Sequence, residues 1–326
     1  MAIIFLSIVR GEGTEELGSV DFDFWESVLT ALFMGPLLGS VSGIAQIITE
    51  EYGYKQISFR KLITLRFIYA ILFWAAIILL AYAVYGNDIT LIAFAFEPGS
   101  YAIYLYLLTV DLFMSGLRQV NLFLGIGNLW RLMSGRFYTP REEERIFMFL
   151  DLQSSTKHAE KLGHIQYSKM IQDCFNDLGV VVENEAEIYQ YVGDEVILTW
   201  QLKAGIKNEN CLNAYFNFQQ QLEKRKHHYI SNYGLLPFFK AGINEGIVTT
   251  TEVGKFKKEI AYHGDTINTA ARIQGKCNDF KQSVLISKNL KDKLDITSFR
   301  FKEMDSIELK GKEQVIQIYG VEQPSL

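Results

Sequence analysis

The sequence predicts two unlike halves: an all-α transmembrane region, followed by an α+β domain in which helices cover one face of a mostly antiparallel sheet. Two observations carry this prediction. Of the 326 residues, 49% are hydrophobic and the mean hydropathy is +0.08, which is too apolar for an ordinary soluble protein and too charged for a pure membrane protein. Charged residues are sparse before about Arg131 and dense after it, which indicates a charged, solvent-exposed domain in the second half.

Three apolar stretches in residues 1–117 are long enough to cross a hydrocarbon core of about 30 Å. They cover residues 27–48, 65–84 and 101–117, and the third is of marginal length. The middle of the second stretch is nearly free of polar groups on every face, which a half-exposed helix in a soluble bundle would not be. Residues 2–9 are too short to cross, and they are either the end of a truncated fourth span or a segment lying on the surface. We therefore expect three spans, or four with that segment.

The charges flanking these stretches predict the orientation. Lysine and arginine near span ends favour the cytoplasmic side. Basic residues follow the first span (Lys55, Arg60, Lys61, Arg66) and the third (Arg118, Arg131, Arg136, Arg141), whereas the connection between the second and third holds Asp88 and Glu97 and no basic residue. We expect a multi-pass protein of the cell inner (plasma) membrane, in contact with the lipid bilayer, with its second half in the cytoplasm.

Residues 118–142 are expected to form a coupling linker, because glycines interrupt an apolar pattern there and Pro140 precedes a charged run. The folded domain is expected over residues 143–326. Its mild acidity gives no reason to expect a nucleic-acid partner. The cysteines Cys174, Cys211 and Cys277 lack the paired spacing of a zinc site or disulfide framework and are expected to be buried thiols.

Strand and helix patterns alternate in this domain. We expect a strand at 146–150, a helix at 164–182, and a hairpin of strands 187–191 and 195–200. A further helix is expected within 208–233, then a second hairpin (238–243 and 246–253), a helix at 266–277 with Asp265 as its N-cap, and closing strands at 299–307 and 314–321.

Two aspartates are placed so that their carboxylates could bind the same divalent metal ions. Asp151 follows the strand 146–150, and Asp194 lies in the turn of the next hairpin, so both carboxylates can meet at one edge of the sheet. Oxygen ligands suit Mg²⁺ or Mn²⁺, and two ions per site could support phosphoryl transfer. One such aspartate alone would more often be a turn or cap residue, but the pair in this order favours a metal site.

Polar residues after Asp151 and on the 266–277 helix complete the candidate site. Gln153, Ser154, Ser155 and Thr156 are expected to open a helix whose free N–H groups can receive phosphate oxygens, although such residues are also ordinary helix caps. Asn268 and Arg272 lie four positions apart and therefore share a helix face. The arginine suits negative charge on a transferring phosphoryl group, although the spacing alone also fits two surface residues.

Four motifs occur in one order: Phe149–Thr156 (FLDLQSST), Val192–Glu195 (VGDE), Gly264–Arg272 (GDTINTAAR) and Leu309–Lys312 (LKGK). Over about residues 145–321, they resemble the catalytic domain of the class III nucleotidyl cyclases, the adenylate/guanylate cyclase family. The resemblance implies an α+β class III cyclase-like sandwich. It also implies that Asp151, Asp194 and the backbone carbonyl of Leu152 bind metal, that Asn268 and Arg272 are catalytic, and that Lys310 binds the triphosphate, with Lys312 as a less certain helper.

In this family, the metal aspartates come from one subunit, and the asparagine and arginine come from its partner. Since one chain here carries both sets, the resemblance implies a homodimer. The base pocket departs from the family pattern: Gln190 stands where adenylate-forming members commonly carry lysine, and Ala261 where they carry aspartate or threonine. Neither position shows the glutamate and cysteine typical of guanylate formation. ATP is the expected substrate on family frequency.

The expected function is that of a membrane-anchored homodimeric cyclase that converts a nucleoside triphosphate to a 3',5'-cyclic nucleotide and pyrophosphate for intracellular signalling. Three alternatives stay open. The domain could be a catalytically silent receptor or nucleotide sensor on the same fold. It could instead make cyclic GMP or a cyclic pyrimidine nucleotide. A diguanylate cyclase is the third alternative, although its Gly-Gly-Asp/Glu-Glu-Phe signature is absent from the sequence.

Overall fold

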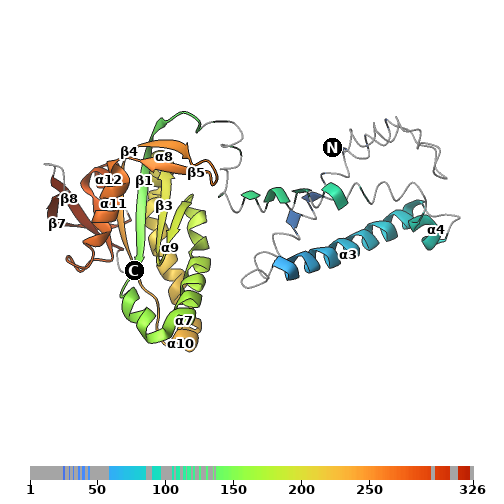
Figure 1. The fold of residues 1–326 in the computed structure, drawn as a ribbon, viewed down its shortest axis with the longest axis horizontal. Helices are drawn as coiled ribbons and strands as arrows, with labels where there is room; N and C mark the ends of the chain where they lie inside the picture. Colours follow the sequence, from blue (N-terminus) through green and yellow to red (C-terminus); the bar gives the residue numbers. More distant parts are fainter. Residues whose placement is uncertain are drawn as a thin grey trace. The chain divides into compact units, whose positions relative to one another are not determined.

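The computed structural model describes residues 59–85, 90–96, 137–294, 298–308 and 315–323, with isolated positions between residues 25 and 135. The chain divides into two units, Met1–Gln119 and Val120–Leu326. In the first unit, α3 (Phe59–Tyr85) and α4 (Leu91–Ala95) are helices (Figure 1), and the apolar stretch 65–84 falls inside α3.

In the part of the chain that the structure describes, no helix combines the length and the apolar character that a membrane crossing requires. Most of the stretches 27–48 and 101–117 lies outside the described residues. The three membrane spans stay a prediction.

The second unit is an α+β domain, as the sequence predicts. Its strands are β1 (Arg141–Leu152), β2 (Glu187–Val192), β3 (Glu195–Gln201), β4 (Phe239–Val253), β5 (Glu259–His263), β6 (Val284–Ser287), β7 (Arg300–Glu308) and β8 (Val315–Glu322). Its helices are α7 (Ser155–Asp177), α8 (Leu202–Ile206), α9 (Asn210–Lys224), α10 (Lys226–Tyr233), α11 (Asp265–Gly275) and α12 (Lys288–Lys293), with short 3₁₀ helices η3 (Leu178–Asn184) and η4 (Lys207–Glu209).

The strands form one sheet in the order β2-β3-β1-β4-β6-β8-β7, with β5 paired to β4. The pairing is antiparallel except between β4 and β6, which run parallel. β1 lies between β3 and β4, with Asp151 opposite Glu195 on one side and Lys240 on the other. The end of this central strand is therefore held on both sides.

Alternate residues of β1 point to opposite faces of the sheet, and each face has its own apolar core. Ile146, Met148 and Leu150 pack with residues of α7, α9 and α10. Phe147 and Phe149 pack on the opposite face with α11 and β5. Figure 1 shows α9 and α11 on opposite sides of β1. The predicted mostly antiparallel sheet with covering helices is present, and α11 in addition covers part of the second face.

The expected second hairpin was wrong. The chain does not turn at Asn244–Gly246 but runs from Phe239 to Val253 as the single long strand β4, whose hairpin partner is β5. The Asn244 side chain is buried and donates its amide N–H to the carbonyl of Thr266 at 3.0 Å. The Thr266 hydroxyl in turn donates to the carbonyl of Ile247 at 2.8 Å. These polar residues hold the start of α11 against β4 instead of forming a turn.

The helix expected at 164–182 begins earlier and ends earlier. α7 starts at Ser155 and is kinked at Gly163, where φ is 74° and ψ is 162°. The segment after the kink starts at the expected position, and η3 takes over at Leu178. The cysteines are free and buried, as expected.

Candidate active site

Asp151 and Asp194 come together at one edge of the sheet, as the sequence predicts. Asp151 is near the end of β1, and Asp194 lies in the turn between β2 and β3. Both are partly buried, and the two carboxylates repel each other. The Oδ2 atom of Asp194 is buried and has no hydrogen-bond partner in the described part of the chain. A buried carboxylate oxygen without a partner is costly unless something else binds it.

A third carboxylate, Glu195, joins this pair and was missed by sequence reasoning. It lies opposite Asp151 in the β1–β3 pairing. The pKa of Glu195 is raised to about 7, mainly by burial and to a lesser extent by repulsion from Asp151 and Asp194. Burial and the Asp194 charge also raise the pKa of Asp151. A hydrogen bond from the Gln274 side chain lowers this pKa but does not cancel the increase. The edge thus carries concentrated negative charge, which a divalent cation would relieve.

The donors fit a hard metal ion through two carboxylates and a backbone oxygen. No set of three or more histidine, cysteine or carboxylate side chains in the described residues is arranged to hold a metal. The predicted site needs only Asp151 and Asp194, with the carbonyl of Leu152 as a further oxygen. An all-oxygen set of this kind suits Mg²⁺ or Mn²⁺, which keep several waters in their coordination shells.

Residues Gln153–Thr156 open α7, which confirms the expected helix start. The Gln153 N–H donates to the carbonyl of Phe238 at 2.9 Å. Ser154 is the N-cap in the left-handed region (φ 60°), and its side chain makes no capping hydrogen bond. Gln153, Ser154 and Thr156 are exposed, while Ser155 is partly buried. This turn lies directly after Asp151, where the free amides of a helix start can receive an anion.

Tyr167 of α7 is another residue that sequence reasoning missed. Its hydroxyl is within hydrogen-bonding reach of Asp194 and Ser155. Burial and the Asp194 charge raise the pKa of Tyr167 to about 12. The residue therefore links the helix that follows the Gln153–Thr156 turn to the aspartate of the β2–β3 turn.

α11 carries the predicted Asn268 and Arg272, and both are exposed. The helix begins at Asp265, and its N-cap is Gly264 rather than the expected Asp265. Gly264 has φ 143° and ψ 167°, a conformation that side-chain-bearing residues rarely adopt. Asp265 instead accepts a hydrogen bond from the Thr269 hydroxyl at 3.3 Å.

Helix geometry places Asn268 and Arg272 on a different side of α11 from Gln274, the residue that reaches the Asp151 of the same chain. Gln274 hydrogen bonds to Asp151, and Arg272 lies two positions earlier in the same helix. Two positions correspond to about 200° of rotation around an α-helix. Asn268 lies about 40° from Arg272 by the same geometry. One chain therefore presents its aspartates and its Asn268–Arg272 pair in different directions.

The two candidate base-pocket residues lie on strands that meet on the α11 face of the sheet. Gln190 is exposed on β2, next to a bulge and opposite Ile197. Ala261 is partly buried on β5, opposite Thr251. Their sequence neighbours Tyr189 and Tyr262 contact each other, with ring centroids 4.9 Å apart. Lys310 and Lys312 lie outside the described residues.

The family described as the adenylate and guanylate cyclase catalytic domain matches residues 137–323. That range covers more than half of the chain and includes every candidate residue described above, so the chain belongs to this family.

Among relatives, adenylate cyclase 2 of Rhizobium meliloti is 31% identical over 210 residues, which cover 64% of this chain and 58% of that protein. The adenylate cyclase of Anabaena cylindrica is 27% identical over 183 residues, 53% of this chain and 36% of that protein. The chain thus spans only part of the length of either relative. Among solved structures, a bacterial light-regulated adenylyl cyclase has a TM-score of 0.58 at 17% identity, over 69% of this chain and 66% of that chain. This likeness shows the fold alone.

Proposed function

We propose that the chain is a membrane-anchored homodimeric cyclase that converts ATP to 3',5'-cyclic AMP and pyrophosphate for intracellular signalling. The observation that carries this proposal is the buried, unpartnered Oδ2 of Asp194 beside Asp151, in a domain of the adenylate and guanylate cyclase family. The relatives from Rhizobium meliloti and Anabaena cylindrica are both named adenylate cyclases, which favours ATP over the other triphosphates.

Asp151, Asp194 and the Leu152 carbonyl would hold two Mg²⁺ or Mn²⁺ ions per site. Bound there, such ions would offset the triphosphate charge and favour ionisation of the ribose 3'-hydroxyl that attacks the α-phosphorus. The turn Gln153–Thr156 would orient the phosphates through the backbone N–H groups that follow Gln153, whose own N–H is bonded to the carbonyl of Phe238. Lys310 would add a positive charge at the triphosphate.

Asn268 and Arg272 would act on a nucleotide held by the aspartates of a second chain. Arg272 would stabilise negative charge that develops during transfer, and Asn268 would orient the ribose. Their position on α11, on a different side from the Gln274 that reaches Asp151 in the same chain, supports this arrangement. A two-fold dimer would then contain two equivalent sites.

Anchoring in the cell inner membrane, with the catalytic domain in the cytoplasm, is supported by the apolar stretches of the first half and the basic residues that flank them. The linker 118–142 would carry changes in the membrane region to the dimer.

The test of the activity uses the detergent-purified full chain with Mn²⁺ and each of the four ribonucleoside triphosphates separately. Products are identified by mass spectrometry beside an Asp194→Ala control. We expect cyclic AMP from ATP and none from the control. No product from any of the four triphosphates would favour the nucleotide sensor. Cyclic GMP or a cyclic pyrimidine nucleotide as the main product would mean that the corresponding triphosphate, and not ATP, is the substrate.

The test of the shared site mixes two inactive variants, Asp194→Ala and Arg272→Ala. A mixed dimer would have one site with both changes and one site with neither. Random mixing should restore about a quarter of the wild-type activity, because half of the dimers are mixed and each has one intact site. No recovery after verified subunit exchange would contradict the shared site.

A further inference from the structure

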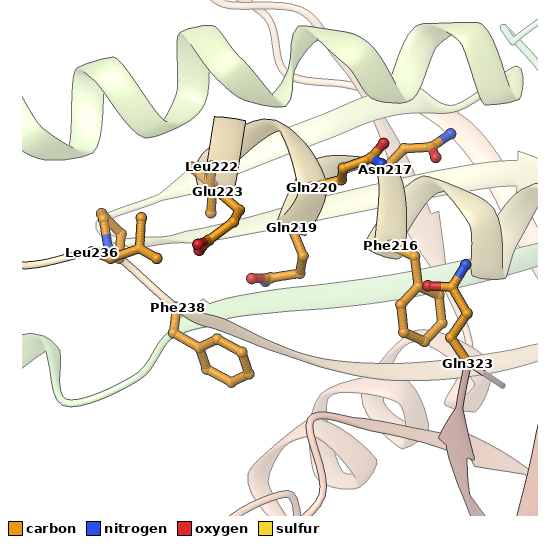
Figure 2. A pocket seen from close by; sticks show the side chains of 10 residues that line it. Phe216, Asn217, Gln219, Gln220, Leu222, Glu223, Leu236, Phe238 and Gln323 are labelled. Carbon is orange, nitrogen blue, oxygen red and sulfur yellow. The ribbon is translucent and has the colours of Figure 1, made fainter. Parts of the chain in front are cut away.

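A cavity of about 440 Å³ lies between α9, the segment that precedes β4, and the end of β8. This volume is within the range of small-molecule sites, about 300–1,000 Å³. Figure 2 shows Gln219 and Glu223 of α9 across the cavity from Phe238, with Phe216 and Gln323 at one end. The candidate catalytic residues within the described ranges do not line this cavity.

The lining combines aromatic rings with side-chain amides and one carboxylate. Phe216 and Phe238 offer flat apolar surfaces, and Phe238 is 41% exposed. The carboxylate is that of Glu223, whose Oε1 pairs at 2.6 Å with Lys226, a residue outside the cavity lining. The described lining includes no lysine, arginine or histidine. An anionic ligand would therefore meet a carboxylate and lack a cation, whereas the amides and Glu223 can accept hydrogen bonds. The amides come from Asn217, Gln219, Gln220 and Gln323.

One wall of the cavity is bonded to the turn that follows Asp151. The carbonyl of Phe238 accepts the backbone N–H of Gln153 at 2.9 Å. The next carbonyl, that of Phe239, accepts the Gln219 side-chain amide at 3.2 Å and the Tyr215 hydroxyl at 2.9 Å. Consecutive backbone carbonyls thus join the cavity wall to the Gln153–Thr156 turn.

We propose that this cavity is an effector site for a small planar ligand that carries hydrogen-bond donors and no negative charge. The ring lies against Phe216 and Phe238, and its donors bind the carboxylate of Glu223 and the oxygen of the Gln219 amide. By moving the Phe238–Phe239 backbone, the ligand shifts the turn at Gln153. The binding step is independent of the proposed cyclase function, whereas the regulatory consequence rests on it.

The binding test uses three probes of the same shape with different charges: benzamide (neutral), benzamidine (cationic) and benzoate (anionic). Binding to the full chain is measured by ligand-observed NMR with saturating Mg²⁺ and pyrophosphate, which occupy the proposed active site. We expect saturable binding of benzamide and benzamidine and at least about tenfold weaker binding of benzoate, a difference of about 1.4 kcal/mol. Equal binding of benzoate, or no saturable binding of any probe, would overturn the proposal.

Two variants locate the binding. Glu223→Gln removes the carboxylate at an exposed position and should weaken the binding of benzamidine more than that of benzamide. Gln219→Leu should weaken the binding of both probes. In this variant the Phe239 carbonyl still accepts a hydrogen bond from the Tyr215 hydroxyl, so it is not left without a donor. Lys203→Ala, at an exposed position on α8 outside the cavity lining, is the control and should change neither. If both lining variants bind like wild type, the probes occupy another site and the proposal fails.

The coupling is tested by hydrogen exchange of the full chain. Benzamide should change the exchange rate of the Gln153 amide, since the acceptor of that amide belongs to the cavity wall. Unchanged exchange at Gln153 under saturating benzamide would refute the coupling. A protein that binds benzamide but makes no cyclic nucleotide would refute the proposed function and leave the ligand site standing.

Discussion

Replacing Gly242 with alanine is expected to impair catalysis although it changes none of the proposed metal-binding or catalytic residues. Gly242 is a buried residue of β4 that lies beneath α11. A Cβ added there would be 2.1 Å from the backbone nitrogen of Gln274 and 2.6 Å from the carbonyl oxygen of Ala270. Both are backbone atoms, so no side-chain rotation relieves the contact. Since ordinary contacts need about 3.5 Å and the closest one here is 2.1 Å, α11 must move away from β4 by more than about 1 Å.

Two magnitudes follow for Gly242→Ala. Overpacking of this kind costs about 1–3 kcal/mol of unfolding free energy. A displacement of about 1 Å in catalytic groups can reduce turnover about 100-fold, and α11 carries Asn268 and Arg272. Cyclase turnover is measured by quantifying cyclic nucleotide by mass spectrometry, and stability by urea unfolding.

Gly275→Ala at the end of the same helix is the matched control, because nothing lies within 4 Å of an added Cβ there. It should leave turnover unchanged and stability equal or slightly higher. If Gly242→Ala retains wild-type turnover and stability, the close approach of α11 to β4 is not what positions the helix, and the reasoning is refuted.

Three further predictions concern stability, pH and substrate. Asp177 is fully buried and binds Arg225 at 2.6 Å, so Asp177→Ala should lower the free energy of unfolding by about 3 kcal/mol in urea titrations. Because the folded-state pKa of Glu195, about 7, lies above its ordinary value of 4.5, its contribution to stability is present below pH 4.5 and is lost as pH rises through 7. The melting temperature of the metal-free wild type should therefore fall over that interval relative to Glu195→Gln, and saturating Mg²⁺ should reduce the difference. Gln190→Lys combined with Ala261→Asp should raise the kcat/KM ratio of ATP to GTP by at least about tenfold, measured by product formation.

Each of these predictions has a contradicting outcome. An Asp177→Ala protein as stable as wild type would mean that Arg225 finds another acceptor. If the melting temperatures of wild type and Glu195→Gln depend on pH in the same way, Asp151 and Asp194 do not repel Glu195 as proposed. An unchanged substrate ratio in the double variant would place base selection at other residues.

The elements that the sequence predicted best are those set by local patterns. The apolar run 146–150 marks β1, and the Gly193–Asp194 turn marks the β2–β3 hairpin, because alternating apolar residues and turn residues act over a few positions. The polar residues in the middle of β4 led to the wrong prediction of a hairpin turn. Asn244 and Gly246 look like a turn in sequence, but they remain in the strand because they pack against Thr266, which is distant along the chain.

In the candidate site too, some residues could be predicted from local patterns and others depend on contacts between distant parts of the chain. Asp151 and Asp194 could be predicted to meet because each ends or follows a recognisable strand. Tyr167, Glu195 and Gln274 could not be assigned, since their importance depends on where α7, β3 and α11 bring them around those aspartates. A tyrosine or glutamine in a helix carries no local signal that it will touch a carboxylate on a different element.

β1 starts at Arg141, immediately after Pro140, and runs without interruption to Leu152, one residue past Asp151. Twelve residues of extended chain span about 40 Å, and neighbours on both sides prevent the strand from bending or sliding alone. Tension or torsion applied where the chain enters the sheet would thus reach the proposed metal-binding carboxylate of Asp151 through covalent bonds, with no intervening loop to absorb it.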